Sequence, residues 1–231
     1  MEGAMELKHG IHKFEGMTGV NCYWTTSDEG VVVIDTANPK SETKILDQLK
    51  AGGKSTEDVK LIIITHADID HLGSAAELKN LTGAKIAIHE SDAAILKGEE
   101  PMKEAQGFFK FIFKIMMGFF KFRTVDPDIL LKDGDEIAGF KVLHTPGHTK
   151  GSIMLFKPNQ LLITGDTLLS DSHAQPRGPI KLFTPDMKQA WSSIRKLHDL
   201  NFEMMLPGHG KPILENAGEK VRVLMEKKHL P

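Results

Sequence analysis

The sequence LIIITHADIDH, residues 61–71, joins an apolar run to a cluster of histidines and aspartates. The apolar residues 61–65 are short, continuous and rich in β-branched side chains, which predicts a buried strand. HADIDH at 66–71 follows directly, in the position where α/β proteins place chemistry because the sheet holds the loop rigid. Imidazole and carboxylate are ligands for zinc, iron or manganese. The stretch therefore predicts a metal site at a strand end.

Three further motifs have the same character. HTPGHT at 144–149, TGDT at 164–167 and PGHG at 207–210 each follow a β-rich run and place a histidine or aspartate near glycine. Taken alone, each is typical of an ordinary polar turn. Four such pieces in order, each ending a β-rich run, favour a common site.

The rest of the chain predicts a mixed α/β fold in which helices cover sheets. Thr184 is expected to cap the last predicted helix, with Pro185 at its first position. The predicted strands span 30–35, 61–65, 84–89, 140–144, 152–156, 160–164 and 204–206, and the predicted helices 41–49, 73–81 and 184–200.

On these motifs the sequence resembles the metallo-β-lactamase superfamily, whose pattern is H-x-[HE]-x-D-H followed by a distant His, a distant Asp and a last His. The resemblance extends from GVVVID at 30–35 to PGHGKPI at 207–213. It implies one α/β domain (α+β by some schemes) over residues 1–231, folded as a four-layer αββα sandwich.

The resemblance also implies two metal ions and a hydroxide between them that acts as the nucleophile. Asp70 would orient the hydroxide and carry its proton to the leaving group, and Asp166 would bridge both ions. The implied ligands are His66, Asp68 and His148 for the first ion, Asp70, His71 and His209 for the second, and Asp166 for both.

Position 68 departs from the family pattern, because most members have histidine where this chain has Asp68. A third carboxylate lowers the formal charge of the site by one. We expect weaker attraction of anionic groups to the ions, a less acidic bound water and a shift from zinc towards manganese or iron.

The implied activity is hydrolysis of an ester, lactone, thioester or phosphoester by two divalent ions, with zinc as the first expectation and iron or manganese as alternatives. A second hypothesis is an oxidoreductase that resembles the mononuclear-iron persulfide dioxygenases of the same superfamily. A third is a non-catalytic scaffold, against which the intact ligand motifs argue.

Substrate residues are expected in two places. His173, Arg177 and Lys181 follow Asp166 in a stretch where a cation could bind a carboxylate or phosphate. Residues 105–122 are rich in phenylalanine and form part of a predicted helical insertion at about 100–124. This segment predicts a homodimer interface or buried helix, a lid that brings Phe109 and Phe113 to the substrate, or a membrane-surface contact, in that order.

Composition limits the remaining classes. The formal net charge of −2 provides no broad field for nucleic acid, so a small-molecule substrate is expected. Cys22 is the single cysteine, which suits a reducing compartment. The first ten residues have no apolar run typical of a secretory signal, and no stretch predicts a spanning helix. We therefore expect a cytoplasmic protein without membrane association.

Overall fold

The computed structural model describes residues 3–103 and 122–228, which form two compact units. The first holds residues 3–102 and 122–131, and the second holds residues 103 and 132–228. Most of the predicted insertion at about 100–124, with Phe109 and Phe113, lies outside the described residues. Within the described ranges, no helix has both the length and the apolar character needed to cross a bilayer.

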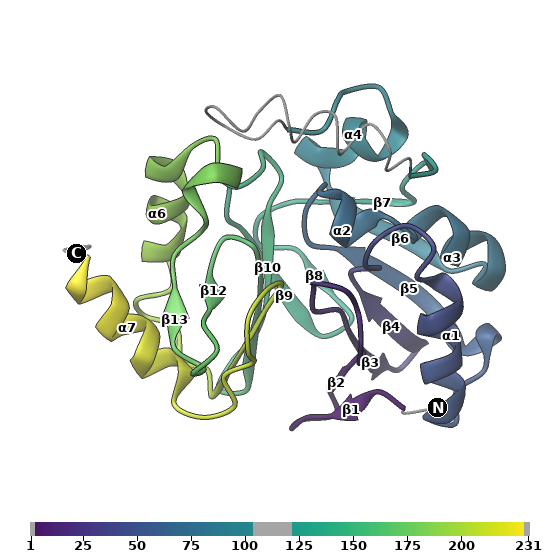
Figure 1. Ribbon diagram of the computed structural model, residues 1–231, viewed down its shortest axis with the longest axis horizontal. Helices are drawn as coiled ribbons and strands as arrows, with labels where there is room; N and C mark the ends of the chain where they lie inside the picture. The colour runs from purple at the N-terminus through teal and green to yellow at the C-terminus, as the bar shows by residue number, and fades with distance from the viewer. Residues whose placement is uncertain (1–2, 104–121, 229–231) are drawn as a thin grey trace. The chain divides into compact units, whose positions relative to one another are not determined.

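The first unit is built on a seven-stranded sheet whose strands follow one another in sequence order (Figure 1). The strands β1 to β4 pair antiparallel and β4 to β7 pair parallel. The parallel half brings the carboxyl ends of β4 and β5 to the same sheet edge. The bounds are β1 Met5–Glu6, β2 His12–Lys13, β3 Tyr23–Ser27, β4 Gly30–Ile34, β5 Val59–Ile64, β6 Lys85–His89 and β7 Ile129–Leu131.

Helices α1 and α3 lie along one side of this sheet (Figure 1). Their buried side chains, Ile45 and Leu49 of α1 and Leu78 of α3, belong to the same apolar cluster as Ile62 and Ile64 of β5. The helices are α1 Glu42–Ala51, α2 Ile69–Leu72, α3 Ala75–Thr82 and α4 Ala93–Lys97, with 3₁₀ turns η1 Thr56–Asp58 and η2 Glu90–Asp92.

Two predicted boundaries in this unit need correction. The expected loop at 66–71 contains the start of α2, which Asp68 precedes as its cap residue. The expected helix at 73–81 begins only at Ala75. Gly73 separates the two helices, and its N–H donates to the carbonyl of Ala37 (3.0 Å). The metal motif therefore combines a strand end with a helical turn.

The second unit has a five-stranded sheet in the order β14-β11-β10-β9-β8 and a small sheet of β12 and β13. Strands β8 to β11 pair antiparallel, whereas β11 and β14 are parallel. The bounds are β8 Glu136–Ile137, β9 Phe140–His144, β10 Ile153–Lys157, β11 Leu161–Gly165, β12 Leu169–Ser170, β13 Pro176–Arg177 and β14 Met204–Pro207.

The predicted helix at 184–200 is wrong at both ends. The 3₁₀ turn η4 (Lys181–Phe183) precedes extended backbone at Thr184, and α6 spans Met187–Arg195. Pro185 disfavours helical backbone at the residue before it. Asp186 caps α6 instead, accepting a hydrogen bond from the Gln189 N–H (2.8 Å).

The core of the second unit joins α6 and α7 (Ala217–Lys227) to the sheet. Ile194 of α6 and Val221 of α7 are fully buried in one cluster with Met205 of β14 and Leu162 of β11. This packing fixes β11 and β14 beneath the helices, and both strands lead into predicted ligand motifs.

Replacing Leu78 by alanine should destabilise the protein by about 2–5 kcal/mol, because the side chain is fully buried against β5 and its removal leaves a cavity. Leu81→Ala in the same helix is the matched control, since Leu81 is 55% exposed and should cost roughly 0.5 kcal/mol or less. Urea unfolding of both variants measures the difference. Equal destabilisation would contradict the described packing of α3.

Candidate metal centre

The first unit holds four of the predicted ligands close together, directly after β5. His66 Nε2 lies 3.5 Å from Asp68 Oδ2, and His71 Nε2 lies 4.0 Å from Asp70 Oδ2. The rings of His66 and His71 are 4.0 Å apart, centroid to centroid. Both histidines are buried, whereas Asp68 and Asp70 are partly exposed. The HADIDH motif thus presents two adjacent nitrogen–oxygen pairs.

Asp35, the residue after β4, orients both histidines. Its Oδ2 accepts hydrogen bonds from His71 Nδ1 (2.8 Å) and from the Thr65 hydroxyl (2.8 Å), while Oδ1 accepts from the Thr65 N–H (2.8 Å). Because the Thr65 hydroxyl donates its proton to Asp35, its oxygen accepts from His66 Nδ1 (3.0 Å). Both imidazoles therefore carry their proton on Nδ1 and present the Nε2 lone pair, the form that a metal requires.

A second buried carboxylate holds the motif from another direction. Asp92 Oδ2 accepts the backbone N–H of Ala67 (2.9 Å), and Asp92 has no exposed surface. On the other side, the N–H of Thr36 donates to the carbonyl of His71 (2.7 Å). The backbone between the two histidines is thus held by hydrogen bonds to two other segments, one at Asp92 and one at Thr36.

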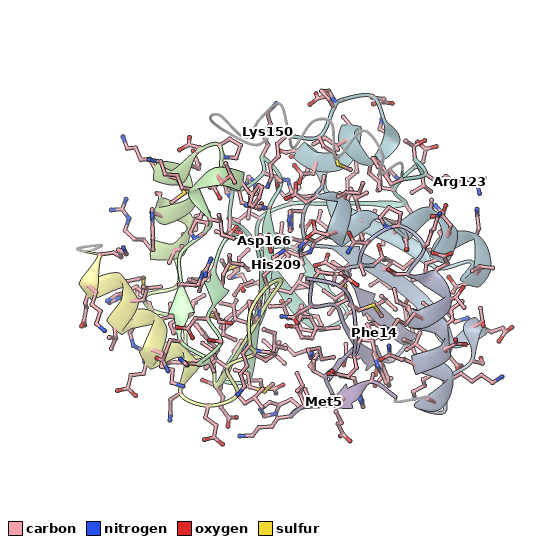
Figure 2. All side chains as sticks on the ribbon, viewed as in Figure 1. Met5, Phe14, Arg123, Lys150, Asp166 and His209 are labelled. Atoms are coloured by element: carbon pink, nitrogen blue, oxygen red, sulfur yellow. The ribbon has the colours of Figure 1, made fainter. Side chains whose placement is uncertain are left out.

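The second unit holds the other three predicted ligands. Asp166 Oδ2 lies 3.5 Å from His148 Nε2 and 3.1 Å from His209 Nε2. Figure 2 shows Asp166 and His209 next to one another. The parallel pairing of β11 with β14 explains this, because Asp166 and His209 follow these neighbouring strands. The N–H of Gly208 donates to the carbonyl of Gly165 (2.9 Å) and ties the two strand ends together.

Glycine is required beside two of these ligands. Gly147 has φ +132°, and a Cβ there would lie 2.3 Å from the backbone nitrogen of Ala190 in α6. Gly210 has φ +96°, and a Cβ there would lie 2.0 Å from the Ser170 carbonyl oxygen. Each glycine therefore allows the loop that carries its histidine to pack directly against the backbone of a neighbouring segment.

His148 has a partner on each ring nitrogen. Lys103 donates a hydrogen bond to Nε2, so Nε2 is the acceptor and Nδ1 carries the proton that points to the Thr184 hydroxyl (3.3 Å). The buried Thr184 thus orients His148 instead of capping α6. The Lys103 ammonium occupies the lone pair that a metal ion would take, so a ligated His148 requires that contact to be exchanged.

These donors fit divalent metal ions. Tetrahedral ligands about 2.1 Å from an ion lie about 3.4 Å from one another, and the nitrogen–oxygen separations within each unit are 3.1, 3.5, 3.5 and 4.0 Å. Imidazole nitrogen and carboxylate oxygen suit zinc, iron and manganese. The predicted ligands therefore fall into two sets of neighbours, one in each unit.

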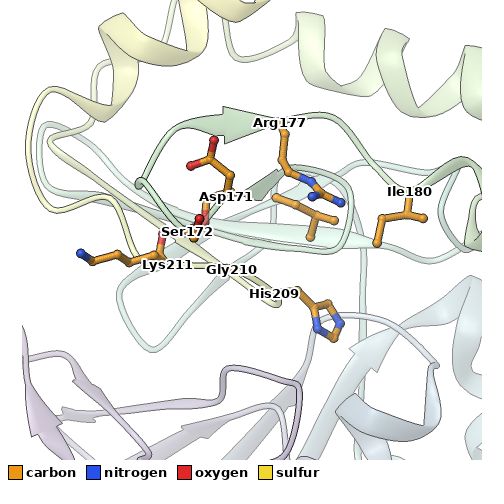
Figure 3. A pocket seen from close by; sticks show the side chains of 9 residues that line it. Asp171, Ser172, Arg177, Ile180, His209, Gly210 and Lys211 are labelled. Carbon is orange, nitrogen blue, oxygen red and sulfur yellow. Dashed lines mark hydrogen bonds between the residues drawn. The ribbon is translucent and has the colours of Figure 1, made fainter.

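A cavity of 580 Å³ in the second unit is bordered by His209 (Figure 3). Arg177 lines it, whereas His173 and Lys181, the other two residues predicted to bind substrate in this stretch, are not among its lining residues. The cavity is lined by Leu169, Ser170, Asp171, Ser172, Arg177, Ile180, His209, Gly210 and Lys211.

Asp35, Asp92, Lys103 and Thr184 contact the predicted ligands or their motif, and the sequence alone did not indicate these contacts. GVVVID at 30–35 carried a usable signal, because a carboxylate that ends a buried strand requires buried partners. Asp92 and Thr184 lie in unremarkable contexts, and only the tertiary structure brings them to the ligands.

The chain is similar to one characterised family. The model of the metallo-beta-lactamase superfamily matches residues 16–209. The protein YobT of Bacillus subtilis (strain 168) is 30% identical over 223 residues, covering 93% of this chain and 92% of YobT. An N-acyl homoserine lactonase of Bacillus thuringiensis is 25% identical, covering 78% of this chain and 75% of the lactonase.

Solved structures show the same fold. The class B3 di-zinc metallo-beta-lactamase LRA-12 from an Alaskan soil metagenome has a TM-score of 0.70 at 24% identity, covering 100% of this chain and 95% of LRA-12. TTHA1623 in a di-iron-bound form has a TM-score of 0.64 at 27% identity, covering 84% of this chain and 88% of its own. The predicted fold class, a mixed α/β sandwich of metallo-β-lactamase type, is thereby confirmed.

Replacing Asp35 by asparagine should weaken metal binding by about 10- to 100-fold, as loss of an outer partner of a metal-ligating histidine does. The amide NH₂ cannot accept a hydrogen bond, so at least one of the three donors to Asp35 loses its acceptor. Competition with a chromogenic chelator measures the affinity.

Asp28→Asn, at an exposed position in the same unit, is the matched control and should leave affinity unchanged. Circular dichroism before and after metal addition establishes that both variants are folded. A folded Asp35→Asn protein with unaltered metal affinity would show that Asp35 does not orient the histidines for a metal.

Proposed function

Because this chain belongs to the metallo-β-lactamase superfamily, we propose that it is a hydrolase that cleaves an ester, lactone, thioester or phosphoester bond at a centre of two divalent ions. We further propose that the two sets of neighbouring donors supply one such centre. The ligands would be His66, Asp68 and His148 for one ion, Asp70, His71 and His209 for the other, and Asp166 for both.

The observation that carries this proposal is the protonation state that the hydrogen bonds impose on three histidines. His66, His71 and His148 each hold their proton on Nδ1, which leaves Nε2 as an acceptor; that of His148 accepts from Lys103, a contact that a metal ion would replace. A solvated polar loop has no need of buried partners that select this tautomer. Metal ligation does need them.

Two divalent ions at such a centre supply a nucleophilic hydroxide near neutral pH and polarise the scissile group. Asp70, which is partly exposed and lies beside His71, would accept the proton of the attacking water and pass it to the leaving group. Asp166 contributes one oxygen near both His148 and His209. Its second oxygen lets one residue serve both ions.

The metal we propose is zinc, with iron or manganese as alternatives that Asp68 favours. LRA-12 is described as di-zinc and TTHA1623 as di-iron-bound, so this fold accommodates both. The third carboxylate at 68 adds a hard oxygen ligand, which favours manganese and iron relative to an all-histidine first site. The dioxygenase alternative has no support among the relatives described above.

A lactone or a related acyl ester is the substrate class that the relatives support best, since one is an N-acyl homoserine lactonase.

Incubation of the metal-loaded full chain with a panel of lactones, thioesters, phosphodiesters and phosphotriesters, followed by product analysis, tests the proposed hydrolase function. Asp70→Asn should lower turnover about 100-fold or more, because proton transfer by a positioned side chain contributes 10²–10⁴-fold. If the metal-loaded wild type hydrolyses no compound of the panel, the proposed hydrolase function is overturned.

Asp68→His should change metal preference and pH dependence together. Removing one carboxylate raises the charge of the centre, so the bound water becomes more acidic and the rise of rate with pH moves to lower pH. The same change should increase zinc occupancy relative to manganese and iron. Elemental analysis and rate-versus-pH curves measure both. Identical metal content and identical curves would show that residue 68 is not a ligand.

The homodimer through residues 105–122, the substrate roles of His173, Lys181, Phe109 and Phe113, and the cytoplasmic location stay predictions. They concern residues or properties beyond the two ligand sets.

A further inference from the structure

The cavity bordered by His209 contains one cation whose charged end points into it. In Figure 3 the guanidinium of Arg177 hangs from β13 into the space between the lining residues. Lys211 lines the same cavity, but Figure 3 shows its ammonium on the far side, directed away from Arg177. The positive charge inside the cavity is therefore that of Arg177.

The Arg177 guanidinium has its donors available. Over residues 3–103 and 122–228, no side chain forms a hydrogen bond or ion pair with it, and the residue is exposed. A guanidinium carries five N–H donors in a planar fork that matches the two oxygens of a carboxylate or phosphate. Such a fork beside a cavity suits an anionic group of this geometry.

Asp171 is the nearest candidate for neutralising Arg177, but its carboxylate serves the turn between β12 and β13. Its Oδ1 accepts the backbone N–H of His173 (2.8 Å) and of Gln175 (2.9 Å). These hydrogen bonds, the one from Gln175 first, lower the pKa of Asp171, so it stays ionised as a turn residue. The Asp171 carboxylate thus interacts electrostatically with Arg177 but does not accept a hydrogen bond from its guanidinium.

Two aliphatic side chains also line the cavity. Leu169 of β12 is buried and Ile180 is partly buried, and both line the cavity with Arg177 and His209. The cavity therefore offers a predicted metal ligand, an apolar wall and a guanidinium within one volume of 580 Å³. These three features suit a molecule that has a reactive carbonyl for the metal centre, a short aliphatic part for the apolar residues and an anionic end for the guanidinium.

We propose that this cavity is a substrate subsite in which Arg177 binds a terminal carboxylate or phosphate while Leu169 and Ile180 contact an aliphatic part of the same molecule. The proposal rests on the proposed hydrolytic function and narrows its substrate class to esters, lactones or thioesters that carry an anionic group away from the scissile bond. The weaker attraction of anionic groups expected from Asp68 is compatible with this subsite, because the anion would bind Arg177 and not the metal ions.

The kinetic test compares three phenyl esters of equal chain length, one ending in methyl, one in carboxylate and one in phosphate. Arg177→Gln should lower kcat/KM for one or both anionic esters by about 10- to 100-fold, the loss expected for a hydrogen-bonded ion pair. The methyl ester should change by less than about twofold. A preference for the carboxylate or for the phosphate ester in the wild type identifies which anion the subsite takes.

Two matched variants serve as controls for Arg177→Gln in this kinetic test. Lys211→Gln removes the charge of a lining residue whose ammonium is directed away from Arg177, and Arg123→Gln removes an exposed guanidinium from the other unit (Figure 2). Each should change kcat/KM for every one of the three esters by less than about threefold. If Lys211→Gln or Arg123→Gln reproduces the effect of Arg177→Gln, the effect is one of general charge and the subsite is refuted.

A binding measurement separates this proposal from the hydrolytic one. In the full chain with ¹⁵N-labelled arginine, adipate or inorganic phosphate should shift one Nε resonance that is absent in Arg177→Gln, whereas neutral adipamide should shift none. If these shifts are observed and the protein hydrolyses none of the esters, the anion site at Arg177 is supported and the proposed hydrolase function is rejected. Ester hydrolysis with no arginine resonance shifted by either anion would overturn the subsite.

Discussion

The structure depends most on the buried carboxylate of Asp35. It accepts three hydrogen bonds at the end of β4, and through them it fixes the backbone after β5, the tautomer of His71 and, by way of Thr65, the tautomer of His66. An isolated carboxylate at this depth would be costly, so its three donors are also what makes its burial tolerable. Asp35 adopts a left-handed φ of +60°, a conformation that aspartate tolerates better than most residues. Such a conformation at a site residue is a common form of stored strain.

The two ligand sets are held by different physical means. In the first unit, buried carboxylates at Asp35 and Asp92 accept hydrogen bonds from the HADIDH motif. In the second unit, close backbone packing at Gly147 and Gly210 and strand pairing between β11 and β14 place the ligands. A carboxylate can tune the basicity of a histidine, whereas backbone packing only positions it. Changes of metal preference should therefore be easier to obtain by substitution around the first set.

Much of the fold was predictable because the parallel strands contain runs of β-branched residues, as at 31–34 and 62–64. The grouping of histidines and aspartates within each unit was predictable because four such motifs each follow a β-rich run, although each motif alone is typical of a polar turn. Helix starts were not, since Thr184 is a good capping residue by type, yet Pro185 and burial beside His148 gave its hydroxyl another partner. Asp92 and Lys103 were missed because their contacts join segments 25 and 45 residues apart, which no local pattern records.

We propose that seven side chains from two sets of neighbours bind two divalent ions. Elemental analysis of the full chain purified without chelators, combined with accurate protein quantification, measures the number of ions bound. We expect about two divalent ions per chain, as in a binuclear hydrolytic centre. A single iron per chain, or none after metal reconstitution, would contradict it.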